Sequence, residues 1–289
     1  MQVDATPPLL NRSTRNSTVA THLLKCIISR PKHNMASQPE PEIVLYDLAC
    51  TKNTCFSLVV WRIRLMLNYK KISYKTIFLE FPDIEPTLKG LLETKKHPEL
   101  TLPSGLVPLE SSAGKYTVPA IHHVPTNTYL IDSVPIAEFL ESTYPEPSLP
   151  LTSEFGSQIQ EQLLPVIGSS LQTSVLAREL PILNPRSQEH FRRMYEPLVG
   201  HPLEDLIDKE EEAWAAVDKE TRAVGELMLK NRADGPFVLG ERPSMTDFFI
   251  VGLIQCVRVV DEGVFQRLTK YPGFGEIYEA CSPFMEKKD

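Results

Sequence analysis

Long apolar runs, an even set of cysteines and an excess of basic residues are all missing from this sequence of 289 residues. Its longest apolar stretch, residues 248–254, is far shorter than the roughly 20 residues of a membrane-spanning helix. Five cysteines are an odd number, which argues against a disulfide scaffold and for a reducing compartment. The net charge of −7 disfavours a nucleic-acid partner. We therefore expect a cytoplasmic protein with no membrane span and no bound nucleic acid.

The charge is unevenly spread along the chain. Residues 1–34 hold five basic residues and one acid, a charge of +4, so the rest of the chain carries −11. This head is also rich in Ser, Thr and Asn, which is typical of a transit peptide. A disordered tail and a translation start at Met35 rather than Met1 are the alternatives. We expect residues 1–40 to lie outside the fold as a disordered or targeting extension, with a mitochondrial location only if 1–34 is a transit peptide.

Hydrophobic periodicity in the first half predicts alternating strands and helices. Residues 43–46 form a short apolar run typical of a buried strand, and 57–69 carry apolar residues at helical spacing. Further segments are expected as strands at 73–80, 116–122 and 129–131, as helices at 88–92 and 132–141, and as a long loop at 97–115. The order β-α-β, loop, β-β-α predicts a thioredoxin-like domain over residues 41–146.

The second half shows no strand pattern. Prolines at 145, 147 and 150 indicate a linker, placed at residues 147–156. Helices are predicted at 159–180, at 203–230 as one long element, and at 244–260, followed by a weak terminal helix. Ser244 and Asp247 fit a capping box at the start of the 244–260 helix. Residues 157–289 are thus predicted to be an all-helical domain, and the fold class is α/β followed by all-α.

Three features of the first half converge on one edge of the predicted sheet. Ser57 opens the first helix directly after the first strand. Val118 precedes Pro119 at a strand start, where a cis peptide bond would leave the Val118 N–H and C=O free to pair with an extended peptide. Asp132 and Ser133 open a helix whose N-terminal amides favour a carboxylate, although Asp132 could instead be only an N-cap. A peptide with a free carboxylate and a free α-amino group would suit the last two residues.

On these motifs the sequence resembles the glutathione S-transferase superfamily over most of residues 42–285. The segments that are similar to its glutathione-binding half are Tyr116-Thr117-Val118-Pro119-Ala120-Ile121 and Asp132-Ser133-x-x-Ile136-Ala137-x-x-Leu140. The segments that are similar to its fungal and bacterial β-etherase-like group include Leu45-Tyr46-Asp47-Leu48, Trp61-x-x-Arg64 and His201-Pro202-Leu203-Glu204. The resemblance implies a thioredoxin-like domain followed by a helical bundle, glutathione as co-substrate, no metal, and a homodimer.

The same resemblance implies roles for individual residues. That group opens its first helix with a serine in a pattern close to Ser-Pro-Asn-x-Trp, and the matching run here is Ser57-Leu58-Val59-Val60-Trp61. Ser57 therefore takes the position of the thiol-activating catalytic serine, while Leu58 and Val59 replace the usual Pro and Asn. Glutathione binding is implied for Val118, Pro119, Asp132 and Ser133. The implied reaction is attack of an activated glutathione thiolate on a small hydrophobic electrophile, in detoxification or secondary-metabolite tailoring.

Other interpretations stay open beside this one. Ser57 could be a simple N-cap, and the loss of Pro and Asn favours a non-catalytic glutathione-transferase-like binding or regulatory protein. Cys55 lies two residues before Ser57, so a cysteine-type glutathione-dependent reductase is a further alternative, although its spacing from Cys50 is not that of the redox Cys-x-x-Cys motif. The neighbouring His122 and His123 do not predict a metal site, because adjacent strand residues face opposite sides of a sheet.

Overall fold

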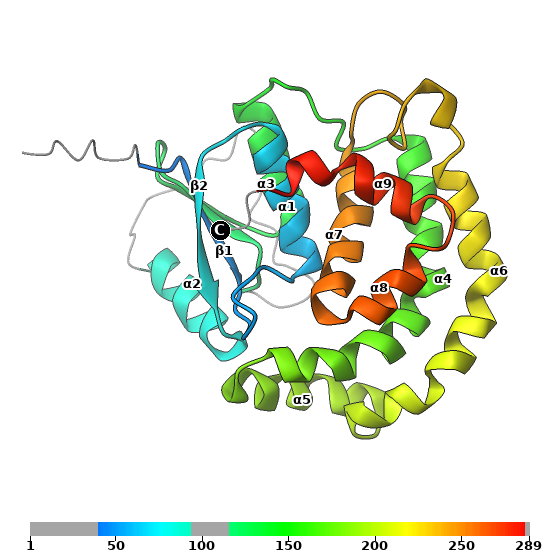
Figure 1. Cartoon of the computed structure of the whole chain (residues 1–289). Helices are drawn as coiled ribbons and strands as arrows, with labels where there is room; N and C mark the ends of the chain where they lie inside the picture. The colour runs from blue at the N-terminus through cyan, green and yellow to red at the C-terminus, as the bar shows by residue number, and fades with distance from the viewer. Residues whose placement is uncertain (1–39, 94–115, 287–289) are drawn as a thin grey trace, which may run out of the picture. The chain divides into compact units, whose positions relative to one another are not determined.

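A four-stranded sheet forms the first half of the fold in the computed structural model, which describes residues 40–93 and 116–286. The strands lie in the order β2-β1-β3-β4; β1 and β2 are parallel and the other pairings are antiparallel (Figure 1). Their bounds are β1 Ile43–Leu48, β2 Tyr74–Leu79, β3 Ala120–His123 and β4 Thr128–Ile131. Every residue of β1 is buried, as its unbroken apolar run predicts for a central strand covered on both faces. The predictions for residues 1–34 and 97–115 lie outside the described residues.

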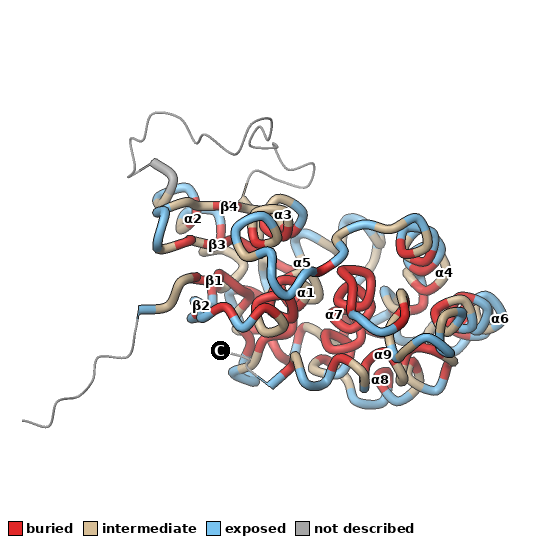
Figure 2. Tube along the Cα trace, turned by 90° about the horizontal axis from the view of Figure 1, so that it is seen from above, coloured by how far each residue is buried: buried red, intermediate tan, exposed pale blue. Residues whose placement is uncertain are grey.

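Helices cover both faces of this sheet. Helices α1 (Leu58–Tyr69) and α3 (Ser133–Thr143) lie on the face toward the second half of the chain, and α2 (Ile84–Glu93) lies on the other (Figures 1 and 2). This is a thioredoxin-like arrangement, as the order of elements predicts. Strands β1 and β4 run in the same direction, because each is antiparallel to β3. Helix α1 follows β1 through the loop 49–57 and α3 follows β4, so both helix N-termini lie at the same end of the sheet (Figure 1).

The second half of the described chain is helical and is centred on α7. Its helices are α4 (Glu154–Glu179), α5 (Pro185–Val199), α6 (Glu210–Met228), α7 (Met245–Val260), α8 (Glu262–Leu268) and α9 (Phe274–Ala280). Nearly all of α7 is buried, and it packs directly on α1 (Figure 2). The close approach requires Gly252, because a Cβ atom there would lie 2.6 Å from the Leu58 carbonyl oxygen. None of the described helices has the length and apolar character that crossing a membrane requires.

The capping box predicted at the start of α7 is present. The Asp247 carboxylate accepts hydrogen bonds from the Ser244 N–H at 2.8 Å and from the Ser244 hydroxyl at 2.6 Å. It also accepts one from the Val238 N–H at 2.8 Å, so it ties the preceding loop to the helix. These contacts satisfy buried donors at the N-terminus of the most buried helix, which gives Asp247 a structural role.

Two predicted elements differ from the structure, and one helix was missed. The single helix expected at 203–230 is a 3₁₀ segment, Leu203–Lys209, followed by α6. The strand expected from residue 116 begins only at Ala120, because Pro119 has no N–H to donate to a neighbouring strand. Helix α5 was not predicted at all. Its charged sequence hides the apolar stripe, although Pro185 in the first turn and Gly200 at the C-terminal cap, with φ of +82°, are ordinary helix start and stop signals.

Candidate functional site

Ser57 lies at the N-cap position of α1, but its side chain does not cap the helix. The residue is 9 % exposed, its backbone is extended, and its hydroxyl makes no capping hydrogen bond. Its carbonyl oxygen accepts the first helical hydrogen bond, from the Trp61 N–H at 2.9 Å. Ser57 is thus the N-cap residue by position, without a side-chain capping bond. The structure instead leaves a hydroxyl at the positive end of a helix with no partner among the described residues.

The peptide bond between Val118 and Pro119 is cis, as the sequence allowed. The carbonyl oxygen of Pro119 accepts a hydrogen bond from the Asp132 N–H at 3.0 Å, which fixes this turn to the start of α3. The backbone N–H and C=O of Val118 belong to no strand and pair with no described residue. They are consequently available to an extended peptide laid along this edge.

Asp132 and Ser133 lie at the N-terminus of α3 in a constrained geometry. Asp132 has φ of +80°, which is uncommon for a residue other than glycine. One of its carboxylate oxygens accepts from the Ser133 N–H at 2.6 Å, so Asp132 is the N-cap of this helix. The buried Ser133 hydroxyl lies 3.5 Å from the same oxygen. The Asp132 carboxylate, the Ser133 hydroxyl and the N-terminal amides of α3 therefore lie close together.

Arg62 adds a positive charge that sequence reasoning missed. Its guanidinium lies 5.3 Å from the centre of the Phe249 ring of α7, and its buried Nε atom has no hydrogen-bond partner. Burial lowers the pKa of Arg62, and the nearby Asp132 carboxylate opposes that effect. The Arg62 guanidinium, which extends from α1, therefore lies near the start of α3. The sequence could not reveal this position, because nothing in it distinguishes a buried arginine in the middle of a helix from one that is exposed to solvent.

The helical half of the molecule encloses the start of α1. Thr51, in the loop before α1, donates from its N–H and its hydroxyl to the Ile182 carbonyl oxygen at 2.8 and 3.2 Å. On α7, the Cys256 sulfur interacts with the Leu58 backbone amide, the first in α1 after Ser57. Among charged groups, Glu179 at the end of α4 has the largest effect on the pKa of Cys256, which it raises. None of these contacts could be predicted, because each joins segments that are far apart in the chain.

Helix α5, in the second half of the chain, contacts the segment between β2 and α2. The Ser187 hydroxyl donates to the Glu80 carboxylate at 3.2 Å and accepts from the Phe81 N–H at the same distance. Arg186 forms a two-point ion pair with Asp83, with distances of 2.9 and 3.1 Å. Helix α5, which the sequence analysis missed, therefore helps to fix the position of the second half against the sheet.

The two cysteines and two histidines singled out in the sequence have other environments. Cys55 is fully buried, and desolvation raises the pKa of its thiol to about 12. The Cys50 thiol donates to the Thr54 carbonyl oxygen at 3.1 Å. His122 stacks on Tyr129, and its ring nitrogen lies 3.1 Å from the Asn127 side-chain oxygen. His123 instead contacts the hydroxyls of Thr126 and Tyr144, so the two rings have separate environments.

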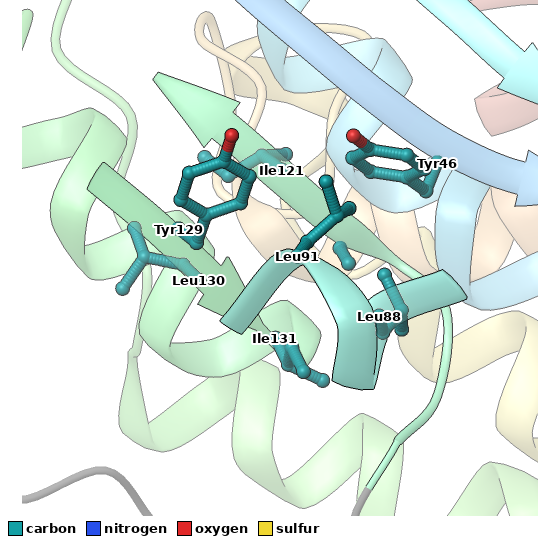
Figure 3. Close-up of a pocket in the computed structure, with 8 residues that line it drawn as sticks. Tyr46, Leu88, Leu91, Ile121, Tyr129, Leu130 and Ile131 are labelled. Carbon is teal, nitrogen blue, oxygen red and sulfur yellow. The ribbon is translucent and has the colours of Figure 1, made fainter. Parts of the chain in front are cut away.

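A small cavity lies between α2 and the sheet (Figure 3). Its volume is about 10 Å³, room for no more than one water molecule. Leu88 and Leu91 of α2 face Tyr129, Leu130 and Ile131 of β4 across it. This apolar gap is a packing defect rather than a ligand site.

These observations define a class of protein: a thioredoxin-like domain followed by a helical domain that packs against it. Comparison with family models gives the glutathione S-transferase N-terminal domain over residues 56–143 and the glutathione S-transferase C-terminal domain over residues 154–270. The glutathione S-transferase-like protein ustS of Aspergillus flavus is 31 % identical over 238 residues, which cover 75 % of this chain and 80 % of that protein. The chain belongs to the glutathione S-transferase superfamily.

Two solved structures of fungal glutathione transferases share this fold. Glutathione transferase GSTFuA3 of Phanerochaete chrysosporium superposes with a TM-score of 0.68 at 26 % identity, covering 85 % of this chain and 97 % of that one. A glutathione S-transferase of Ceriporiopsis subvermispora, solved in complex with glutathione, gives 0.68 at 28 % identity, covering 86 % and 99 %. The superfamily resemblance seen in the sequence is thus confirmed.

Proposed function

We propose that this protein is a serine-type glutathione transferase, in which Ser57 activates the glutathione thiol for attack on a small organic electrophile. The observation that carries the proposal is the Ser57 hydroxyl, which is nearly buried at the N-terminus of α1 and makes no capping bond. A hydroxyl that neither caps its helix nor pairs with a neighbour is available to donate to a sulfur anion. The proposed place of the protein is among the β-etherase-like members of the superfamily.

The binding residues proposed for glutathione fit the chemistry of that tripeptide. The unpaired backbone groups of Val118, beside Pro119, would pair with its central amide groups as an added strand does. The α3 N-terminus with Ser133 would hold the γ-glutamyl carboxylate, and Asp132 the α-amino group. Arg62 lies close enough to Asp132 for their charges to interact, and would add positive charge for the same carboxylate.

The energetic demand on Ser57 is modest. A free thiol has a pKa near 8.5, and lowering it to about 6.5 requires roughly 2.7 kcal/mol of extra stabilisation of the thiolate. That shift raises the thiolate fraction at pH 7 from about 3 % to about 75 %. One charge-assisted hydrogen bond contributes about 1.5–3 kcal/mol, and a helix N-terminus contributes about 0.3–1 kcal/mol more. The hydroxyl and the helix are sufficient together.

A non-catalytic glutathione-binding role is the second candidate, and one observation favours it. The Leu58 amide, where the related group has proline, interacts with the Cys256 sulfur. Proline has no N–H, so this interaction removes no donor relative to the related group; the donor that is lost is the asparagine side chain, which Val59 cannot replace. The reductase alternative has less support, because a thiol with a pKa of about 12 is almost entirely protonated at pH 7 and Cys55 is fully buried.

Ultraviolet difference titration of bound glutathione distinguishes the two candidates. For the enzyme we expect the thiol pKa to fall by about two units on binding, and to return by at least one unit in Ser57→Ala. Ser169→Ala, at an exposed serine of α4, is the matched control and should behave like the wild type. Binding without a change in thiol pKa would leave only the non-catalytic role. Sedimentation at several concentrations tests the homodimer that belongs to the same proposal.

A further inference from the structure

Trp61, near the start of α1, donates two hydrogen bonds to the backbone that leads into the helix. Its indole Nε1–H donates to the Cys55 carbonyl oxygen at 3.1 Å, and its backbone N–H donates to the Ser57 carbonyl oxygen at 2.9 Å. These two carbonyls lie on either side of Phe56, which is itself buried. One residue therefore holds both ends of the short backbone segment that carries the Ser57 hydroxyl.

A buried ion pair lies beside the indole. The Arg64 guanidinium lies 5.8 Å from the centre of the Trp61 ring and donates to the Asp47 carboxylate at 2.8 Å. It also donates to the Thr76 hydroxyl at 3.0 Å, so it is tied to both β1 and β2. The side chains of Arg64 and Asp47 are fully buried, and a buried polar network of this kind is rigid. The sheet thus fixes the arginine against which the indole lies.

The helical half of the chain also packs against Trp61. The residue has no exposed surface, and a Cβ atom at Gly252 of α7 would lie 3.4 Å from the Trp61 Cβ. A buried indole N–H needs an acceptor, and the Cys55 carbonyl oxygen supplies it. Because the indole is enclosed between the sheet side and α7, the carbonyl that accepts from it is held in place as well.

Ser57 has few other constraints on its position. Its hydroxyl makes no capping hydrogen bond, so its location follows from the backbone. In the related group the next residue is a proline, whose ring fixes φ at the start of the helix. Here that residue is Leu58, which imposes no such restriction. The two hydrogen bonds from Trp61 are therefore a main source of order in the backbone around the serine.

We propose that Trp61 is a positioning residue for the proposed reaction: its indole holds the Cys55 carbonyl, and thereby aims the Ser57 hydroxyl at the glutathione sulfur. This inference rests on the proposed function, because it needs a thiolate at Ser57. A hydroxyl that is shifted or turned out of line donates a weaker hydrogen bond. Trp61 consequently acts on the thiol pKa, whereas the peptide part of glutathione depends on Val118 and the start of α3.

The matched pair for the test is Trp61→Phe and Trp214→Phe. The chain has two tryptophans, both are buried, and the Trp214 indole donates to the Ser174 hydroxyl at 2.8 Å between α6 and α4. Each substitution removes one indole N–H and keeps an aromatic ring. We expect the thiol pKa of bound glutathione to rise by about one unit in Trp61→Phe and to keep the wild-type value in Trp214→Phe.

Turnover and a second ligand separate positioning from a general loss of structure. A rise in thiol pKa from about 6.5 to about 7.5 lowers the thiolate fraction at pH 6.5 from about 50 % to about 9 %, so turnover of chlorodinitrobenzene should fall about fivefold. S-methylglutathione presents the same peptide without an ionisable thiol, and its dissociation constant in Trp61→Phe should stay close to the wild-type value. A merely structural role would weaken both ligands together, and that result would overturn the proposal.

An isostere covers the case in which Trp61→Phe does not fold. In the Trp214→Phe background Trp61 is the sole tryptophan, and it can be replaced by β-(3-benzothienyl)alanine, which has the shape of tryptophan with sulfur in place of the N–H. This protein should show the same rise in thiol pKa with its packing retained. A wild-type thiol pKa in the isostere protein would overturn the role of Trp61 alone. Absence of thiolate in the wild type would instead overturn the proposed function and this inference with it.

Discussion

The contact between α1 and α7 can be tested with a single methyl group. A Cβ atom at Gly252 would lie 2.6 Å from the Leu58 carbonyl oxygen, 3.4 Å from the Trp61 Cβ and 3.5 Å from the Arg62 Cγ. Since a close carbon–oxygen contact is about 3.3 Å, one helix must move by about 0.7 Å to accommodate Gly252→Ala. The first contact is with backbone, so no side chain can rotate to relieve it.

The free-energy change follows from two opposing contributions. Overpacking a core costs about 1–3 kcal/mol, whereas replacing glycine by alanine inside a helix gains about 0.5–1 kcal/mol. Gly168→Ala in α4 is the matched control, because a Cβ atom there has nothing within 4 Å. The control carries the helix-propensity gain without the contact. The difference in unfolding free energy between the two variants should therefore be about 1–3 kcal/mol, with Gly252→Ala the less stable.

Urea denaturation of both variants measures this difference, with the slope of unfolding free energy against urea checked for equality. Glutathione affinity provides the functional readout. Leu58 directly follows Ser57, so displacement of its carbonyl should weaken glutathione binding in Gly252→Ala and leave it intact in Gly168→Ala. If the two alanine variants were equally stable and bound glutathione equally well, the close packing of α7 on the start of α1 would be wrong.

Three other predictions follow from buried groups. Asp247→Ala should lower the unfolding free energy by about 2–5 kcal/mol in urea, because the Val238 and Ser244 amides lose their acceptor. Glu179→Gln should stabilise the fold by up to about 3 kcal/mol at pH 7 and by little at pH 4.5. The pKa of Glu179 is raised to about 8 in the folded state, so the wild type loses stability as the pH rises from about 4.5 to 8. An equal difference in melting temperature between wild type and variant at the two pH values would contradict this prediction. Cys55, with a pKa of about 12, should resist iodoacetamide in the folded protein at pH 8 and react in urea, as peptide mass mapping would show.

Local sequence patterns determined most of the elements because those patterns have local causes. The apolar run of β1 and the stripe of α1 appear in the sequence with their spacing intact, and the Ser244–Asp247 capping box needs only neighbours three residues apart. The motif around Pro119 and the start of α3 indicated a peptide-binding edge for the same reason. Helix α5 was not predicted because it is rich in charged residues and its apolar stripe is narrow, although Pro185 and Gly200 marked its ends.

The tertiary structure alone decided what surrounds Ser57. The sequence placed this serine at a helix start, but whether its hydroxyl capped that helix depended on a side-chain rotation that spacing does not specify. Cys256 and Glu179 became candidates only because helices more than a hundred residues away in the chain pack near α1. Arg62 became a candidate only because its charge lies near that of Asp132 at the start of α3. Burial changes the acidity of such groups, and burial is a property of the folded chain as a whole. The sequence by itself determined the family, the fold class and the helix that carries the serine; packing between distant segments decided which acids, thiols and cations stand around it.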